Sequence, residues 1–333
     1  MTTTPSTQAA ATPVPASDTR ADSKTGFSAI VELTKPRITR LVVITSGVGF
    51  TLGALGQHWQ AGDLAARAIL CILGTALSAS GANALNQWWE RERDALMPRT
   101  CARPLPQSRV TPRTALIWGL IFSLLGVSLL FFLGTGPAFV SLATILIYVL
   151  VYTPLKPLTT LNTIVGAIPG ALPPLIGWSA AATGNQLLAS GSGLSSLKDP
   201  GAWSLVLLMV IWQIPHVLAL AWMYRDDYAL GGYRMLPILD PSGRTTARTI
   251  LIWSAVFIPV AIAPCWLMPD RLSIAYGIIA AAMGIWFLWL GIRLARGRER
   301  VDARRVFIAS IIHLPVLLMA MVADALLGLW IRR

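Results

Sequence analysis

The sequence predicts an all-α integral membrane protein with nine transmembrane helices. Of its 333 residues, 55% are hydrophobic and only 13% are charged, whereas about a quarter of the residues in a soluble domain are charged. The apolar runs are continuous and about 20 residues long, which is the length of a helix that crosses a bilayer. They lack the alternating segments of about ten residues that are typical of a membrane β-barrel.

The nine helices are expected at the long apolar runs of the chain. These runs fall at about residues 38–55, 64–86, 114–133, 137–153, 162–181, 203–224, 247–268, 272–293 and 306–330. The first opens after Thr34-Lys35-Pro36-Arg37, and the fourth closes at Tyr152-Thr153-Pro154-Leu155-Lys156. The fifth is rich in Gly and Pro between Gly166 and Trp178, which favours close helix packing and a deformed helix. Pro215 should kink the sixth. The remaining helices are predicted from the length of their apolar runs alone.

Lysine and arginine residues gather on one side of these predicted helices. The formal net charge is +12, and most of the 27 Lys and Arg residues lie in the N-terminal segment and in alternate loops. By the positive-inside rule, the N-terminus is expected in the cytoplasm and the C-terminus in the periplasm. Arginine-rich, lysine-poor usage favours a bacterium, hence its inner membrane. Because the charge follows topology, we expect the lipid bilayer as partner and no nucleic acid.

The predicted helices occupy nearly the whole chain, so the sequence indicates one polytopic membrane domain over residues 28–333. Residues 1–27 are rich in Thr, Ser, Ala and Pro, which predicts a disordered cytoplasmic tail. Cys71, Cys101 and Cys265 are scattered and show neither metal-ligand spacing nor an evident pairing.

The most informative motif is the run from Asn86 to Asp94, at the end of the second predicted helix. Asn86, Glu90 and Asp94 are spaced four residues apart, which places them within about 80° of one another on a helix. Two carboxylates at this spacing repel each other unless a cation lies between them. Amide and carboxylate oxygens are ligands that Mg²⁺ prefers when it bridges protein to phosphate. The run therefore predicts a catalytic magnesium site for one or two ions.

A second acidic pair, Asp226 and Asp227, ends the sixth predicted helix on the same side. It is the candidate for a second group of metal ligands, and a plain helix end with an Arg–Asp pair is the alternative. Basic side chains near the two clusters are suited to phosphate oxygens. The expected substrate-binding residues are Lys35, Arg37, Arg99, Arg103, Tyr152, Lys156 and Arg225. For each Lys and Arg among them, a topological role alone is the alternative.

Two histidines lie inside predicted membrane helices. His216 follows Pro215 in the sixth helix, and His313 lies in the ninth. An ionisable residue within the membrane is a functional candidate by default. Both are predicted to contact a substrate, and a hydrogen bond to a neighbouring helix is the alternative for each.

Taken together, these residues resemble the UbiA-type intramembrane prenyltransferases, and within them the branch that farnesylates heme b. The likeness covers roughly residues 28–330. It rests on Asn86/Glu90/Asp94 with Arg99-Thr100 and Arg103-Pro104-Leu105, on the runs 34–37, 152–156, 173–178 and 212–216, and on Met235-Leu236-Pro237. Two positions depart from the family pattern. Glu90 stands where Asp is usual, and Gly231 stands where a second Asp would follow Asp227.

The resemblance implies nine helices around a central cavity with polar caps over its cytoplasmic mouth. It also implies transfer of farnesyl from farnesyl diphosphate to a vinyl group of heme b, with addition of water, to give heme O and pyrophosphate. Heme A synthase or terminal oxidase assembly proteins are the implied protein partners. The resemblance implies that His216 or His313 helps to orient heme.

Two other functions compete with this interpretation. A prenyltransferase acting on an aromatic quinone precursor would share the metal site and differ in the acceptor pocket. A transporter would also contain broken helices, although its key charges should lie nearer the centre of the bilayer.

Overall fold

The computed structural model describes residues 26–55, 57, 59–182 and 193–331, and the predicted tail lies outside them except for Gly26 and Phe27. The helices are α1 (Gly26–Leu33), α2 (Pro36–Ala54), α3 (Ala61–Leu96), α4 (Pro112–Leu133), α5 (Thr135–Leu146), α6 (Thr153–Leu155), α7 (Asn162–Ala171), α8 (Pro173–Ala181), α9 (Pro200–Met223), α10 (Arg225–Leu230), α11 (Leu236–Leu239), α12 (Arg244–Leu267), α13 (Ile274–Gly297) and α14 (Arg300–Ile331). A π-helical turn, η1 (Ile147–Tyr152), joins α5 to α6, and a short 3₁₀ turn, η2 (Ser195–Lys198), precedes α9.

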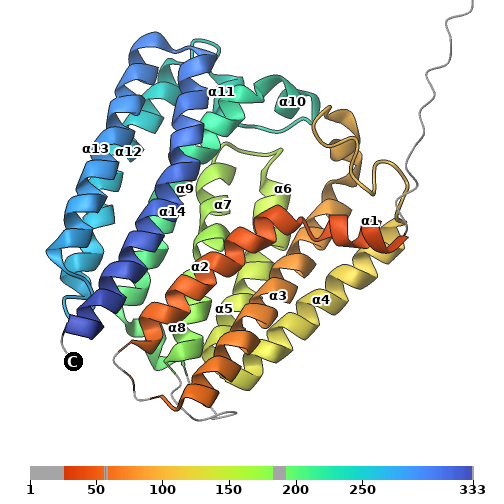
Figure 1. Ribbon diagram of the computed structural model, residues 1–333. Coiled ribbons are helices and arrows are strands. Elements are labelled where there is room, and N and C mark those ends of the chain that lie inside the picture. Colours follow the sequence, from red (N-terminus) through yellow and green to blue (C-terminus); the bar gives the residue numbers. More distant parts are fainter. Residues whose placement is uncertain (1–25, 56, 58, 183–192, 332–333) are drawn as a thin grey trace, which may run out of the picture.

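The described residues form a bundle of long helices, as predicted (Figure 1). Within them, eight helical segments are long and apolar enough to cross a membrane: 61–96, 112–133, 135–155, 162–181, 200–223, 244–267, 274–297 and 300–331. The remaining predicted span corresponds to α2, which has 19 residues. Arg37 and Arg40 near its start lower its mean hydropathy, so the count of nine is not confirmed.

Local sequence signals fix several helix ends. Thr111 precedes α4, where its hydroxyl accepts a hydrogen bond from the Thr114 N–H at 3.1 Å. Asp199 caps α9 in the same way through the Gly201 N–H at 2.8 Å. Both caps are followed by proline at the first helical position, where its missing N–H costs nothing.

Prolines have different effects in the two helices that the sequence predicts to be deformed. The fifth predicted span is divided at Leu172 into α7 and α8, just before Pro173. Pro215, by contrast, lies inside an unbroken α9.

Glycine allows α2 and α8 to pack with their backbones in contact. A β-carbon at Gly177 would overlap the Ser46 carbonyl oxygen, and one at Gly49 would overlap the Pro174 carbonyl oxygen. Small residues at such contacts are typical of membrane helix pairs. Since α2 also packs against α3, the segment before α2 is held beside the polar end of α3.

The helix ends that carry the Asn86-to-Asp94 run and the Asp226/Asp227 pair lie at one end of the bundle, which we call the polar end. In Figure 1, α10 and α11 lie at this end, together with the segment that follows α3. There α3 continues to Leu96, ten residues beyond its predicted membrane part. The whole Asn86-to-Asp94 run is therefore helical.

Candidate active site

Asn86, Glu90 and Asp94 lie on one buried face of α3, as the spacing predicts. Their exposed fractions are 0%, 4% and 1%. Three polar side chains are rarely buried together in an apolar bundle unless each has a partner.

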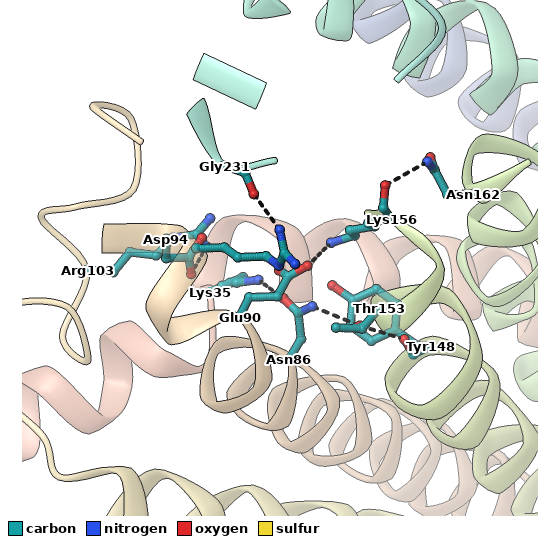
Figure 2. A network of polar contacts seen from close by, with 11 residues as sticks. Lys35, Asn86, Glu90, Asp94, Arg103, Tyr148, Thr153, Lys156, Asn162 and Gly231 are labelled. Atoms are coloured by element: carbon teal, nitrogen blue, oxygen red, sulfur yellow. Dashed lines mark hydrogen bonds and ion pairs between the residues drawn. The ribbon is translucent and has the colours of Figure 1, made fainter. Parts of the chain in front are cut away.

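Each of these three oxygen donors is paired with a cation (Figure 2). Lys35 Nζ donates to Asn86 Oδ1 at 2.7 Å. Lys156 Nζ donates to Glu90 Oε1 at 2.7 Å. The Arg103 guanidinium donates to Asp94 Oδ2 at 2.6 Å. Three basic side chains face two carboxylates, so the cluster carries an excess positive charge, which favours an anion, when Lys35 is protonated.

The Asn86 amide is oriented by its second contact. Its NH₂ group donates to Thr153 Oγ1 at 3.0 Å, and the Thr153 hydroxyl donates to the Tyr148 carbonyl at 2.8 Å. Because the amide nitrogen is held by Thr153, the amide oxygen faces Lys35. This places an oxygen donor on the same side as the two carboxylates.

The two lysines of the cluster lie in different electrostatic surroundings. Burial and the nearby Arg103 charge lower the pKa of Lys35 to about 7. Burial also acts to lower the pKa of Lys156, but the Glu90 carboxylate outweighs it and raises the pKa well above its ordinary value. The Lys156 ammonium also lies 4.6 Å from the centre of the Tyr152 ring. Lys156 is therefore the firmly charged member of the pair.

The second acidic pair is divided between two surroundings. Asp227 accepts a hydrogen bond from the Arg99 backbone N–H at 3.2 Å. The Arg99 guanidinium lies over the rings of Tyr224 and Tyr228, at 5.3 and 5.1 Å from their centres. Asp226 is exposed and lies 3.5 Å from Arg225. Neighbouring residues on a helix point about 100° apart, which is why one carboxylate faces the α3–α4 segment and the other does not.

The region around α10 is tied to α3 by a contact that the sequence did not suggest. The Arg93 guanidinium donates to the Gly231 carbonyl at 2.8 Å, as the dashed line to Gly231 in Figure 2 shows. Gly232 follows with a positive φ of 68°, which favours glycine. The turn places Tyr233, which is 5% exposed, with its ring centre 5.8 Å from Lys156 Nζ. Burial and the Glu90 carboxylate raise the pKa of Tyr233.

Asn162 is another residue that sequence reasoning missed. Its side-chain NH₂ donates to the carbonyls of Lys156 at 3.3 Å and Arg234 at 2.9 Å. It therefore fixes the Lys156 segment against the one that leads to Met235-Leu236-Pro237. The one available signal was an asparagine at the start of an apolar run.

The other predicted substrate contacts lie away from this cluster. Arg37 is exposed in the first turn of α2. His216 Nδ1 is 2.7 Å from Ser310 Oγ on α14, and its ring stacks between Trp212 and Phe307. His313 is fully buried, with its ring edge-on to Phe257 and Phe287 at 4.8 and 5.2 Å. Among the described residues, neither ring nitrogen of His313 has a hydrogen-bond partner.

The side-chain oxygens of Asn86, Glu90 and Asp94 are of the kind that binds magnesium, although each is paired with a basic side chain in this structure. Over the described ranges, no three His, Cys, Asp or Glu side chains are close enough to hold a metal ion. Asn86, Glu90 and Asp94 nevertheless supply three hard oxygen donors on one helix face, which is the ligand type that Mg²⁺ prefers. A metal bound with a polyanion could take these donors while the anion takes their cationic partners.

An apolar groove runs along α2 and α14. It has a volume of about 670 Å³ and is lined by α2, α3 and α14, through residues such as Leu41, Ile44, Val48, Leu318 and Met319. Leu41 is six residues beyond Lys35, or about 9 Å along a helix. One end of the groove thus lies near Lys35, and its other end lies near Cys71 and Leu326. Lining side chains such as Ile44 and Met319 are exposed, so the groove is open along the side of the bundle.

A helical membrane bundle with a buried cluster of carboxylates and basic groups, and with an apolar groove along α2, defines an enzyme for molecules with a charged head and an apolar chain. The family model described as the UbiA prenyltransferase family matches residues 41–314. The chain belongs to this family of prenyltransferases.

Two sequence relatives that match most of the chain carry the same protein name. A protein of Solibacter usitatus named protoheme IX farnesyltransferase is 42% identical over 301 residues, covering 88% of this chain and 97% of its own. A protein of Salinibacter ruber with the same name is 37% identical over 293 residues, covering 88% and 96%.

Solved structures agree with the fold. The structure described as digeranylgeranylglyceryl phosphate synthase has a TM-score of 0.71 at 16% identity, covering 90% of this chain and 98% of its own. A UbiA homolog from Archaeoglobus fulgidus bound to GPP and Mg²⁺ has a TM-score of 0.59 at 14% identity, covering 89% and 99%. At these identities the likeness shows the fold alone.

Proposed function

We propose that this prenyltransferase transfers the farnesyl group of farnesyl diphosphate to a vinyl group of heme b, giving heme O and pyrophosphate. The observation that carries the proposal is the buried Asn86/Glu90/Asp94 cluster with its three basic partners, Lys35, Lys156 and Arg103. The choice of heme b follows the names of the relatives that match nearly the whole chain. A quinone precursor as acceptor would use the same cluster, and identification of the reaction product distinguishes the two.

The cluster's role follows from its charges. Asn86, Glu90 and Asp94 would hold magnesium, with Asp227 nearby at the α3–α4 segment, and the ion would neutralise the diphosphate. The A. fulgidus homolog bound to GPP and Mg²⁺ has the same fold. Asp226 belongs to the proposed second set, although its side chain lies beside Arg225.

The reaction starts when the bond between farnesyl C1 and the diphosphate oxygen breaks and the electron pair leaves with pyrophosphate. Lys156, Arg99 and Arg103 stabilise the negative charge that develops on the leaving group. Lys35, Arg37, Tyr152 and Arg225 are proposed to complete the binding surface for the substrates. Because Lys156 and Arg103 are already in place beside buried carboxylates, little reorganisation is needed.

The farnesyl cation must then be kept from water until the acceptor reacts. We place the farnesyl chain in the groove between α2 and α14, whose lining is apolar except for Thr51 and Cys71. The heme vinyl group forms the new carbon–carbon bond through its terminal carbon. The cation left next to the ring takes up water and loses a proton, which gives the hydroxyethylfarnesyl side chain. His216 and His313 are proposed to orient the heme.

The proposal extends to location. A multi-pass bundle in a family with bacterial relatives suits a bacterial inner membrane, with the polar end and N-terminus in the cytoplasm and the C-terminus in the periplasm. Heme A synthase or terminal oxidase assembly proteins would receive the product.

The test is turnover by purified protein with heme b, farnesyl diphosphate and Mg²⁺, with the product identified by mass spectrometry. We expect heme O, no product after chelation of Mg²⁺, and near-complete loss of turnover in Asp94→Asn. Glu92→Gln is the matched control, because Glu92 lies on the same helix and its side chain is 85% exposed. Full Mg²⁺-dependent activity in Asp94→Asn, or prenylation of a quinone precursor in place of heme, would overturn the proposal.

A further inference from the structure

A second basic pocket lies at the polar end, apart from the Asn86/Glu90/Asp94 cluster. It has a volume of about 220 Å³ and is lined by Trp222, Met223, Arg225, Asp226, Arg298 and Arg300. These residues come from the end of α9, the start of α10 and the turn between α13 and α14. Three arginines and one aspartate line the pocket, so it favours an anion.

The one carboxylate in the pocket, that of Asp226, is only weakly held there. Asp226 lies 3.5 Å from Arg225, and the two side chains are 86% and 53% exposed. Exposed pairs of this kind contribute little, so a ligand anion can replace Asp226 next to Arg225 at small cost. Arg298 and Arg300 flank the turn that begins α14, where Arg298 has a positive φ of 54°.

The pocket is aligned with the aromatic stack around His216. The His216 and Phe307 rings are 5.0 Å apart at 29°, and α9 packs against α14. Met223 lies seven residues after His216 on α9, and Arg300 lies seven residues before Phe307 on α14. Seven residues are two helical turns, or about 10 Å, and return to nearly the same face. Both helices therefore lead from the stack to the pocket.

This combination fits one edge of a porphyrin. Heme b is a flat apolar ring with two neighbouring propionate carboxylates on one edge and vinyl groups elsewhere on the rim. We propose that Arg225, Arg298 and Arg300 bind the propionates of the heme acceptor, with Trp222 and Met223 against the ring edge. This inference rests on the proposed function and deepens it, because it names the groups that recognise the acceptor.

The location favours a substrate over a lipid head group. A lipid phosphate needs only a cation at the membrane surface, which many exposed arginines of this chain supply. The pocket instead combines the side chains of Trp222 and Met223 with three arginines, in line with an aromatic stack about two turns deeper. Binding both carboxylates there would fix which edge of the ring faces the polar end, and so which edge faces the bundle.

The experiment compares the double variant Arg298→Gln/Arg300→Gln with the wild type in phosphatidylcholine vesicles. Arg296→Gln is the matched control, because Arg296 is exposed in the last turn of α13 and does not line the pocket. The dissociation constants of heme b and of its dimethyl ester, which lacks the propionate charges, are read from the Soret band. The KM values for heme b and farnesyl diphosphate are measured in parallel.

We expect the double variant to bind heme b about tenfold more weakly, from about fivefold or less for each exposed charge pair. Binding of the dimethyl ester and the KM for farnesyl diphosphate should stay within twofold, and Arg296→Gln should match the wild type. An unchanged dissociation constant for heme b, or equal losses for heme b and its ester, would overturn the inference.

Two further arms distinguish a lipid ligand, and a different acceptor, from propionate binding. If the loss appears only in vesicles with phosphatidylglycerol and is equal for both porphyrins, a lipid head group occupies the pocket and the inference fails. If the wild type makes no heme O but shows the expected arginine-dependent binding, the proposed function fails while the propionate site stands. If heme b does not bind at all, both fail.

Discussion

The ion pair between Glu90 and Lys156 offers a quantitative test of the buried cluster. The Glu90 side chain is 5% exposed, the Lys156 side chain is 16% exposed, and they are joined at 2.7 Å. Removing one partner of such a pair leaves a buried charge without compensation, which costs about 3–5 kcal/mol. Lys35 also lies close enough to interact with Glu90. We therefore expect Lys156→Met to lose about 3 kcal/mol, at the lower end of that range.

The double variant Glu90→Gln/Lys156→Met provides the control, because it removes both charges together. Replacing a buried ion pair by uncharged groups of similar volume is often close to neutral. Thermal unfolding in detergent should show Lys156→Met well below the wild type and the double variant largely restored. Turnover should be lost in both, since both lack the leaving-group cation. A single variant as stable as the wild type, or a double variant no better than the single, would refute the reasoning.

Three further predictions concern packing and charge. Gly177→Ala should lower the unfolding temperature, because overpacking against the Ser46 carbonyl costs about 1–3 kcal/mol. Gly47→Ala, which has open space around it, should leave that temperature unchanged or slightly higher, since Ala is favoured over Gly inside a helix. Arg67→Met should also lower the unfolding temperature, since the buried Arg67 guanidinium donates to two carbonyls at the ends of α4 and α8, and equal unfolding temperatures would contradict this. Lys35→Gln should raise the KM for farnesyl diphosphate about tenfold or more, as expected for loss of a charged hydrogen bond, and an unchanged KM in steady-state assays would exclude direct contact.

The acidic run on α3 could be predicted because its information is local. Helical spacing alone places Asn86, Glu90 and Asp94 on one face, and the structure confirms it. Their cationic partners could be named only as a group. Lys35 and Lys156 lie 51 and 66 residues from the side chains that they contact, and no periodicity encodes which pairs meet.

The directions of the two histidines and of Asp226 and Asp227 could not be predicted from the sequence pattern. In an apolar helix with little amphipathicity, nothing in the sequence says which face points inward. His313 faces two phenylalanines, whereas His216 faces the α9–α14 contact. Asp226 and Asp227 were grouped because they are adjacent, yet adjacency on a helix separates their directions. The contact of Arg93 with Gly231 depends on a glycine turn, which the sequence marks only as a Gly-Gly pair.

The pairing of every donor with a cation has a consequence for how substrate binds. Without substrate, Glu90 and Asp94 are neutralised by Lys156 and Arg103, so the buried carboxylates do not destabilise the bundle. A magnesium diphosphate supplies a cation and an anion together. The metal can replace Lys156 and Arg103 at the carboxylates, and the phosphate oxygens can then pair with these two side chains. Neither metal nor diphosphate alone satisfies both the carboxylates and the basic side chains. Binding of the two should therefore be mutually dependent, with each raising the affinity for the other by the same factor.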